Sequence, residues 1–277
     1  MTVWVFLTVL LAAALHASWN AVAKSGDDKV LTTFMVATAA AVAAGIALPF
    51  LDLPARASWP FLISSVVVHI GYFALVAAAY RVGDMGQTYP LMRGTAPFLI
   101  ALVSAFWLGE KLSPPAWLGI ALISGGIITM LKETNGGNAR AVYLALLNAV
   151  VIASYTLIDG SGSRLSAAPG AYASWVFALT GVPLAIWVLF TRRDAFIGLV
   201  QTRWRAAAFG GAATVVSYAL VLTAMTMAPV AVVAALRETS ILFGTAIAGL
   251  ILREKLGPAR LIGAGLIGVG AIALRLA

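Results

Sequence analysis

The segment WLGEKLSPPAWLG at residues 107–119 returns in altered form as ILREKLGPARLIG at residues 251–263. Each copy ends an apolar run with a Glu-Lys pair and starts a new apolar run after proline. When the two copies are superimposed, the matches continue along the chain and pair Arg93 with Arg237, Thr95 with Thr239, Glu110 with Glu254, Pro114 with Pro258 and Gly119 with Gly263. Similarity at one fixed offset is typical of an internal repeat, so the sequence predicts two related halves.

The amino-acid composition is that of a membrane protein. Of the 277 residues, 62% are hydrophobic and only 10% are charged, and the mean hydropathy is +0.99. The apolar stretches are roughly 18 to 25 residues long, enough to cross a hydrocarbon core of about 30 Å as helices. A transmembrane β-barrel would instead show alternating segments of about ten residues. We therefore predict an all-α integral membrane protein with ten transmembrane helices near residues 2–23, 30–51, 58–80, 85–108, 114–131, 139–159, 170–191, 204–226, 229–252 and 257–276.

The first helices of the two halves are also similar. HASWNAVAKSG at 16–26 matches IASYTLIDGSG at 152–162, and the polar, Gly- and Asn-rich stretch KETNGGNAR separates the halves. We predict a first five-helix repeat at residues 1–132, a linker at 133–140 and a second repeat at 141–277. The connections between helices are too short to hold a soluble domain, so the helices themselves must carry the function.

Five helices in each repeat place the two repeats in opposite orientations in the membrane. The predicted connections hold twelve basic residues on one side and four on the other, namely Lys24, Lys29, Arg81, Lys132, Arg140, Arg192, Arg193, Arg203, Arg205, Arg253, Lys255 and Arg260 against Arg56, Lys111, Arg164 and Arg275. The positive-inside rule explains this asymmetry without nucleic-acid binding, and it predicts that both termini face away from the cytoplasm. Inverted repeats can exchange conformations about an axis in the membrane plane, which is the architecture of a carrier.

The quoted motifs resemble a known family. HASWN in the first span, Tyr89, Pro90 and Arg93 in the fourth, and the GEKL and REKL steps at 109–112 and 253–256 are similar to the drug/metabolite transporter superfamily, in its ten-helix branch with two EamA-type repeats. The resemblance implies a basket-like bundle with a central cavity lined by the first, third and fourth helices of each repeat, with the fifth helices at the periphery. It also implies a place in the bacterial inner membrane and similarity to YddG-type exporters of aromatic and neutral amino acids.

Polar side chains inside spans are costly and rarely face lipid, so they are the best guide to a cavity. In the first span His16, Trp19 and Asn20 share one face at helical spacing, and in the third span His69 and Tyr72 do the same. For a single His within a span, a hydrogen bond between helices is the alternative role. The candidate cavity residues are His16, Trp19, Asn20, His69, Tyr72, Tyr89, Arg93, Tyr155, Tyr218, Arg237 and Glu238.

Arg93 and Arg237 each lie about eight residues into the fourth and ninth spans, and these two spans start at opposite surfaces. Both guanidinium groups therefore originate near the membrane midplane, about 12 Å from their own surface. Glu238 is adjacent to Arg237, and neighbouring residues on a helix point about 100° apart, so we expect Glu238 to pair with Arg93 instead. The pair serves either as a buried structural ion pair or in substrate binding and gating.

The sequence offers no catalytic site. An intramembrane enzyme would need a nucleophile with its base, or a metal constellation, at fixed spacing, but the two His lie on different helices and the chain has no Cys. We expect no catalytic residue, no metal and no cofactor. A passive scaffold would not need charged side chains near the midplane of both repeats. The expected function is a secondary carrier that exports neutral and aromatic amino acids by alternating access, with multidrug efflux or export of another metabolite as the alternative.

The expected partners are a small-molecule substrate and the lipid bilayer. Small residues such as Gly119 and Gly263 allow close contact between helices, either within a monomer or in a homodimer.

The sequence leaves the energy source of transport open. A uniporter would let a metabolite run down its own gradient, whereas proton coupling would use titratable groups inside the spans, for which the candidates are His16, His69, Asp159 and Glu238.

Overall fold

The computed structural model describes residues 1–83, 85–133, 138–251 and 256–277, with their side chains except at 24, 85–87, 132–133 and 251. Across these residues there are helices and turns but no β-strand. Nine helices of the described part are long and apolar enough to cross a membrane, and the shorter apolar helix Pro114–Thr129 makes a tenth. The predicted all-α membrane architecture with ten helical spans is confirmed.

The first repeat contains α1 (Val3–Lys24), α2 (Lys29–Ala47), α3 (Trp59–Val82), α4 (Met85–Phe106) and α5 (Pro114–Thr129). The second repeat contains α6 (Ala139–Ser166), α7 (Pro169–Thr191), α8 (Arg193–Met227), α9 (Val230–Arg237), α10 (Ser240–Ala246) and α11 (Pro258–Leu276). Short helical turns extend or connect these helices, and they are η1 (Leu48–Phe50), η2 (Arg56–Ser58), η3 (Met130–Glu133) and η4 (Ile247–Ile251).

The predicted ninth span is present as Val230–Leu250, but a tight turn near its middle, which the sequence did not predict, divides it into α9 and α10. The backbone N–H groups of Glu238 and Thr239 donate to the carbonyl oxygens of Ala235 and Leu236, three residues earlier. Such bonds tighten the chain into a 3-10 turn, which separates α9 from α10. The interruption lies beside the buried charged residues of this span.

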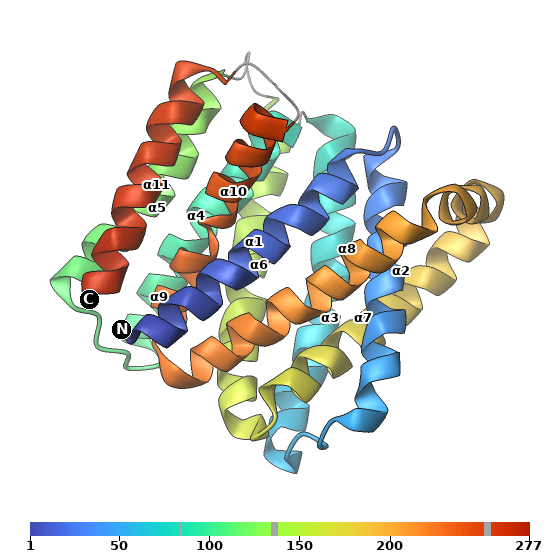
Figure 1. Cartoon of the computed structure of the whole chain (residues 1–277), viewed down its shortest axis with the longest axis horizontal. Helices are drawn as coiled ribbons and strands as arrows, with labels where there is room; N and C mark the ends of the chain where they lie inside the picture. Colours follow the sequence, from blue (N-terminus) through green and yellow to red (C-terminus); the bar gives the residue numbers. More distant parts are fainter. Residues whose placement is uncertain (84, 134–137, 252–255) are drawn as a thin grey trace.

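α8 consists of two helical segments that meet at Arg203, and the second starts where the sequence predicted the span, whereas the first, from Arg193, was not predicted. The backbone departs from helical geometry at Arg203, where φ is −124° and ψ is 21°. A local break of this kind kinks a helix. The segment before the kink projects beyond the bundle at the right of Figure 1.

The two repeats pack against each other in matching pairs. The first helix of each repeat packs against the third helix of the other, which pairs α1 with α8 and α6 with α3. The two second helices, α2 and α7, pack against each other. α5 and α11 lie side by side at one edge of the bundle (Figure 1). A Cβ atom on Gly126 would come within 2.7 Å of the carbonyl oxygen of Gly263, so these glycines allow the two backbones to touch. The fifth helices are therefore peripheral and close-packed within the chain, whereas a homodimer stays a prediction.

The two ends of the bundle differ in what they carry. Both termini lie at one end (Figure 1), where Arg275 Nη1 donates to the carbonyl oxygen of Met1 at 2.7 Å. We call this end the terminus face; it also carries the connection 107–113 between α4 and α5. The opposite end, which we call the basic face, includes Lys29 and Arg192 at the ends of α2 and α7.

The first Glu-Lys step ends one helix and begins the next, as predicted. α4 ends at Phe106, and the Ser113 hydroxyl caps α5, whose first residue is Pro114. Proline is favoured there because its missing N–H would have no helical partner in any case. In the second copy Pro258 begins α11 in the same way. The rest of that step lies outside the described residues, namely Arg253, Glu254 and Lys255.

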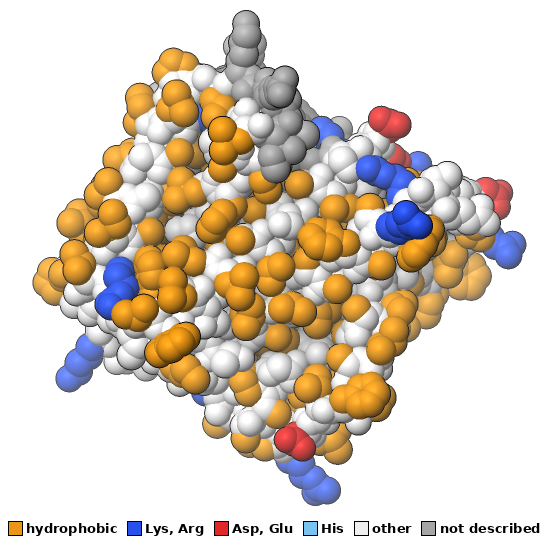
Figure 2. All heavy atoms as spheres, in the orientation of Figure 1, with side chains coloured by type: hydrophobic (Ala, Val, Ile, Leu, Met, Phe, Trp, Pro, Cys, Tyr) orange, Lys and Arg blue, Asp and Glu red, His pale blue; other side chains and the backbone are white. Residues whose placement is uncertain are grey.

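The sides of the bundle are apolar, as contact with lipid tails requires. Trp4, Phe106 and Leu250 are more than four-fifths exposed, at 81%, 85% and 81%. Figure 2 shows hydrophobic side chains across the middle of one side of the molecule and charged side chains towards its margins. A band of exposed apolar side chains is unfavourable in water but matches the hydrocarbon core of a bilayer.

Candidate functional site

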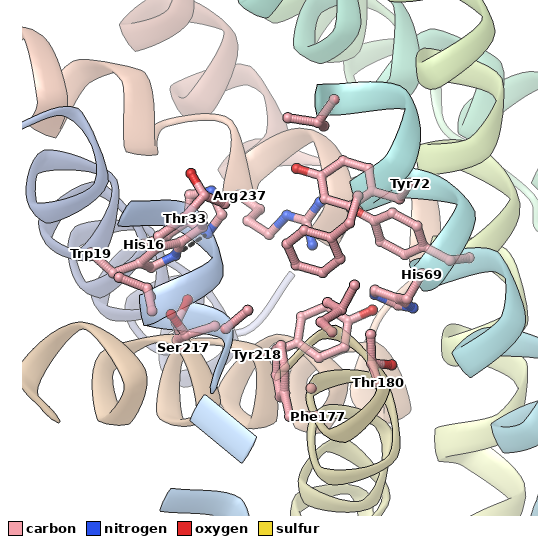
Figure 3. Close-up of a pocket in the computed structure, with 18 of the residues that line it drawn as sticks. His16, Trp19, Thr33, His69, Tyr72, Phe177, Thr180, Ser217, Tyr218 and Arg237 are labelled. Carbon is pink, nitrogen blue, oxygen red and sulfur yellow. Dashed lines mark hydrogen bonds between the residues drawn. The ribbon is translucent and has the colours of Figure 1, made fainter. Parts of the chain in front are cut away.

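A cavity lies inside the bundle, between helices of both repeats (Figure 3). It encloses about 890 Å³, its open side included, and α1, α2, α3, α4, α6, α7, α8 and α9 contribute lining side chains. The first, third and fourth helices of each repeat are among them, as the resemblance implied. Most of the residues predicted from the sequence line this cavity, and they are His16, Trp19, His69, Tyr72, Arg93, Tyr155, Tyr218 and Arg237.

Within the described part of the chain, three of the predicted residues do not line the cavity. Asn20 turns back along α1, where its Nδ2 donates to the carbonyl oxygen of His16 at 2.9 Å. Glu238 is held by Arg93. Tyr89 lies one turn from Arg93, nearer the basic-face end of α4. In this conformation these three side chains therefore do not form part of the cavity wall.

α2 and α7 also line the cavity, which neither the residue pattern nor the resemblance predicted. Thr33 of α2 and Phe177 and Thr180 of α7 face the space, together with Ser217 of α8. Thr and Phe are ordinary residues within an apolar span, so the sequence carried no signal for them. Their position follows from the packing of α2 against α7, a long-range contact that becomes visible only in the folded bundle.

The cavity is displaced towards the basic face. Thr33 and Trp19 lie four and five residues from the basic-face ends of α2 and α1. On the other side, Phe177 lies eight residues from the terminus-face end of α7, and His69 and Ser217 lie ten residues from the ends of α3 and α8. At 1.5 Å per residue, about 6–8 Å of helix separates the cavity from the basic face, against roughly 12–15 Å from the terminus face.

One carboxylate serves two guanidinium groups at the cavity wall. Arg93 Nε lies 2.8 Å from Glu238 Oε2, and all of these side chains are about 95% buried. Arg237 Nε lies 4.0 Å from Glu238 Oε1, beyond hydrogen-bond distance. The predicted pairing of Glu238 with Arg93 is thus confirmed. Arg237 Nε and Arg93 Nη2 are buried and have no hydrogen-bond partner among the described residues.

These two unsatisfied donors define the chemistry of the site. A buried guanidinium nitrogen without a partner costs free energy, which an acceptor on a bound molecule can recover. Both lie beside the same carboxylate, so the region around Glu238 carries more positive than negative charge. A carboxylate is the natural ligand, because it can accept hydrogen bonds from both guanidinium groups.

Aromatic rings form the rest of the wall. His69 and Tyr155 stack with their ring centroids 4.2 Å apart, and Tyr72 meets Tyr155 edge to face at 5.8 Å. Trp19 Nε1 donates to His16 Nδ1 at 3.1 Å. Figure 3 shows this pair on one side of the space near Arg237, with His69 and Tyr72 on the other side. The cavity thus combines a cationic centre with apolar, electron-rich walls.

Two contacts close the bundle between the cavity and the terminus face. Glu110, from the first Glu-Lys step, accepts the backbone N–H of Val230 at 2.9 Å at the start of α9 and pairs with Arg164 Nη2 at 2.8 Å. Deeper in the bundle, Asp159 binds the hydroxyl groups of Tyr172 and Tyr218. No group of three or more possible metal ligands is found among the described residues.

A membrane-spanning bundle of two repeats around a buried, partly open cavity is the architecture of a membrane transporter. The sequence model of the EamA-like transporter family matches residues 3–132 and 139–276, and the chain belongs to this family. A solved structure titled "Crystal structure of protein" has the same fold, with a TM-score of 0.77 over 99% of this chain and 96% of that chain at 19% identity. No curated protein matches the sequence.

Proposed function

We propose that this transporter is a secondary carrier that exports neutral amino acids, with aromatic side chains favoured, by alternating access. The observation that carries the proposal is the pair of buried, unsatisfied guanidinium nitrogens of Arg237 and Arg93 at the wall of an aromatic cavity. An α-carboxylate would accept hydrogen bonds from both. An aromatic side chain would pack on the rings that line the same space.

The α-ammonium group needs a site other than Glu238, the acidic residue nearest to the two arginines. Its carboxylate is engaged by Arg93 and it does not line the cavity. The faces of Tyr72 and Tyr155 offer a cation-attracting surface instead, and the hydroxyl of Ser217 is an acceptor on the opposite wall. A zwitterionic amino acid would thus find one site for its carboxylate and another for its ammonium group within the same cavity.

The repeat symmetry supports the proposal of alternating access. The cavity now lies nearer the basic face, and exchanging the conformations of the two repeats would place it nearer the terminus face. The positive-inside rule favours a cytoplasmic basic face, which makes the present conformation the one that loads substrate from inside the cell. We infer a bacterial inner-membrane location with both termini outside the cytoplasm. A C-terminal alkaline phosphatase fusion should be active, and strong activity of a cytoplasmic fluorescent fusion would contradict this orientation.

Efflux of hydrophobic drugs is the second candidate, favoured by the aromatic walls alone. The buried positive charge of Arg237 at the cavity wall disfavours a cationic drug, because like charges repel in a low-dielectric site. Cells that express the carrier should resist toxic analogues of aromatic amino acids and release labelled amino acids faster. Arg237→Ala should abolish the resistance, whereas Arg140→Ala, at the exposed start of α6, should retain it. Expulsion of cationic dyes without amino-acid efflux would establish the drug alternative.

A further inference from the structure

A carboxylate without a cationic partner is buried beside the cavity. Asp159 of α6 is 0% exposed. Tyr172 of α7 donates its hydroxyl to Oδ1 at 3.0 Å, and Tyr218 of α8 donates to Oδ2 at 2.5 Å. No Lys or Arg forms a salt bridge with Asp159 among the described residues. A lone charge in a membrane interior is expensive and marks a functional group.

The surroundings of Asp159 connect it to the cavity. Ser65 and His69 of α3 face its carboxyl group, with Ser65 Oγ and His69 Nδ1 3.0 Å apart. His69 and Tyr218 both line the cavity, so a path of polar atoms runs from the cavity to Asp159. Arg237 of α9 lines the same cavity as these two residues. Asp159 itself does not line the cavity, so it is a site separate from the one for substrate.

The same cluster joins three helices on the terminus-face side of the cavity. Asp159 lies seven residues from the end of α6, and Tyr172 lies three residues from the start of α7. An opening to the terminus face that separates α7 and α8 from α6 would break both hydrogen bonds to Asp159. The carboxylate would then lose both tyrosine donors within the membrane. A neutral carboxyl group tolerates that loss far better than a charged one.

We propose that Asp159 is the proton-binding site through which this carrier couples export to a proton gradient, an inference that rests on the proposed carrier function. A proton from the terminus-face side adds to one carboxylate oxygen when the cluster opens. When the cluster closes, the two tyrosine hydroxyls donate to the carboxylate again, and the proton leaves through Tyr218 and His69 to the cavity. One proton thus moves towards the basic face as substrate moves the other way. Tyr218 lines the substrate cavity and also donates to Asp159, so it links substrate binding to proton binding.

The test uses the full chain in liposomes with the membrane potential clamped. Exchange of labelled for unlabelled aromatic amino acid at equal pH reports the carrier alone. A gradient of about one pH unit should drive about tenfold accumulation if one proton exchanges for one substrate. Asp159→Asn should retain exchange but lose the accumulation. Asp52→Asn, at an exposed Asp in the connection before α3, should retain both.

The outcomes separate this inference from the proposed function. Exchange without pH-driven accumulation in the wild type, or undiminished accumulation in Asp159→Asn, would overturn the proton site and leave the carrier intact. Absence of exchange for every amino acid would overturn the proposed substrate. Infrared titration of the purified protein from about pH 5 to about pH 9 then still tests Asp159. A protonated-carboxyl band that titrates in the wild type and is missing in Asp159→Asn supports the proposal, and identical spectra contradict it.

Discussion

Arg93 Nε and Glu238 Oε2 meet at 2.8 Å although the two residues are 145 positions apart and belong to different repeats. Arg93 lies on α4, and Glu238 lies at the turn where the ninth span is interrupted between α9 and α10. Both side chains are almost fully buried. The contact therefore joins the two repeats at the level of the cavity, where the proposed alternating access would require them to move relative to each other.

Glu238→Ala is expected to destabilise the fold, because it leaves two buried guanidinium groups without their shared carboxylate. Removing one partner of a buried ion pair typically costs about 3–5 kcal/mol. Thermal unfolding of the purified protein in detergent should show a lower midpoint than the wild type.

The double variant Arg93→Met with Glu238→Leu is the control for this effect. Replacing both members of a buried pair with apolar side chains is often neutral, so much of the lost stability should return. If Glu238→Ala unfolds at the wild-type temperature, the carboxylate does not stabilise the two guanidinium groups, and the structural role assigned to it is wrong.

Glu110→Gln is expected to loosen the terminus face. Glu110 accepts the N–H of Val230 at the start of α9 and pairs with Arg164, so the neutral amide weakens both contacts. Because the chain has no Cys, a single Ser217→Cys substitution labels the cavity specifically. An impermeant maleimide added from the terminus-face side should react faster when Glu110→Gln is also present.

Lys111→Gln is the matched control, since Lys111 is adjacent in the same step, whereas Glu110 makes the contacts with α9 and α6. This variant should leave the labelling rate unchanged. Equal acceleration by both substitutions would mean that the connection 107–113 loosens in general and that Glu110 does not hold the terminus face closed.

The contact between Asp28 and Arg192 on the basic face should respond to pH. Partial burial raises the pKa of Asp28, but the N–H of Leu31 at 2.9 Å and Arg192 Nη1 at 2.6 Å outweigh this and hold the pKa below its usual value. Its contribution to stability is then complete above the unfolded pKa of about 3.9 and is lost as pH falls through the lower folded pKa. Asp28→Asn should lower the unfolding midpoint at neutral pH, and the difference from wild type should shrink in acid. A difference that is constant with pH would refute this explanation.

The sequence predicted the spans, their pairing into repeats and the Arg93–Glu238 contact, because membrane length, self-similarity and the cost of buried charge all leave signals in single residues. It did not predict the break beside Glu238 or the contributions of Thr33 and Phe177 to the cavity. The break arises because two backbone N–H groups donate to the carbonyl oxygen three residues earlier and not four residues earlier. No proline or glycine at this point of the sequence indicates the change. The contributions of α2 and α7 depend on packing between distant spans.

The most direct test of the central claim is counterflow in liposomes that contain the purified carrier and are preloaded with an unlabelled aromatic amino acid. Wild-type protein should accumulate the labelled amino acid transiently, and Arg140→Ala should do the same. Arg237→Ala should bind substrate about 10- to 100-fold more weakly, the loss expected for one hydrogen bond to a charged group, while it remains folded. Absence of counterflow for every neutral amino acid in the wild type, or unchanged counterflow in Arg237→Ala, would contradict the account.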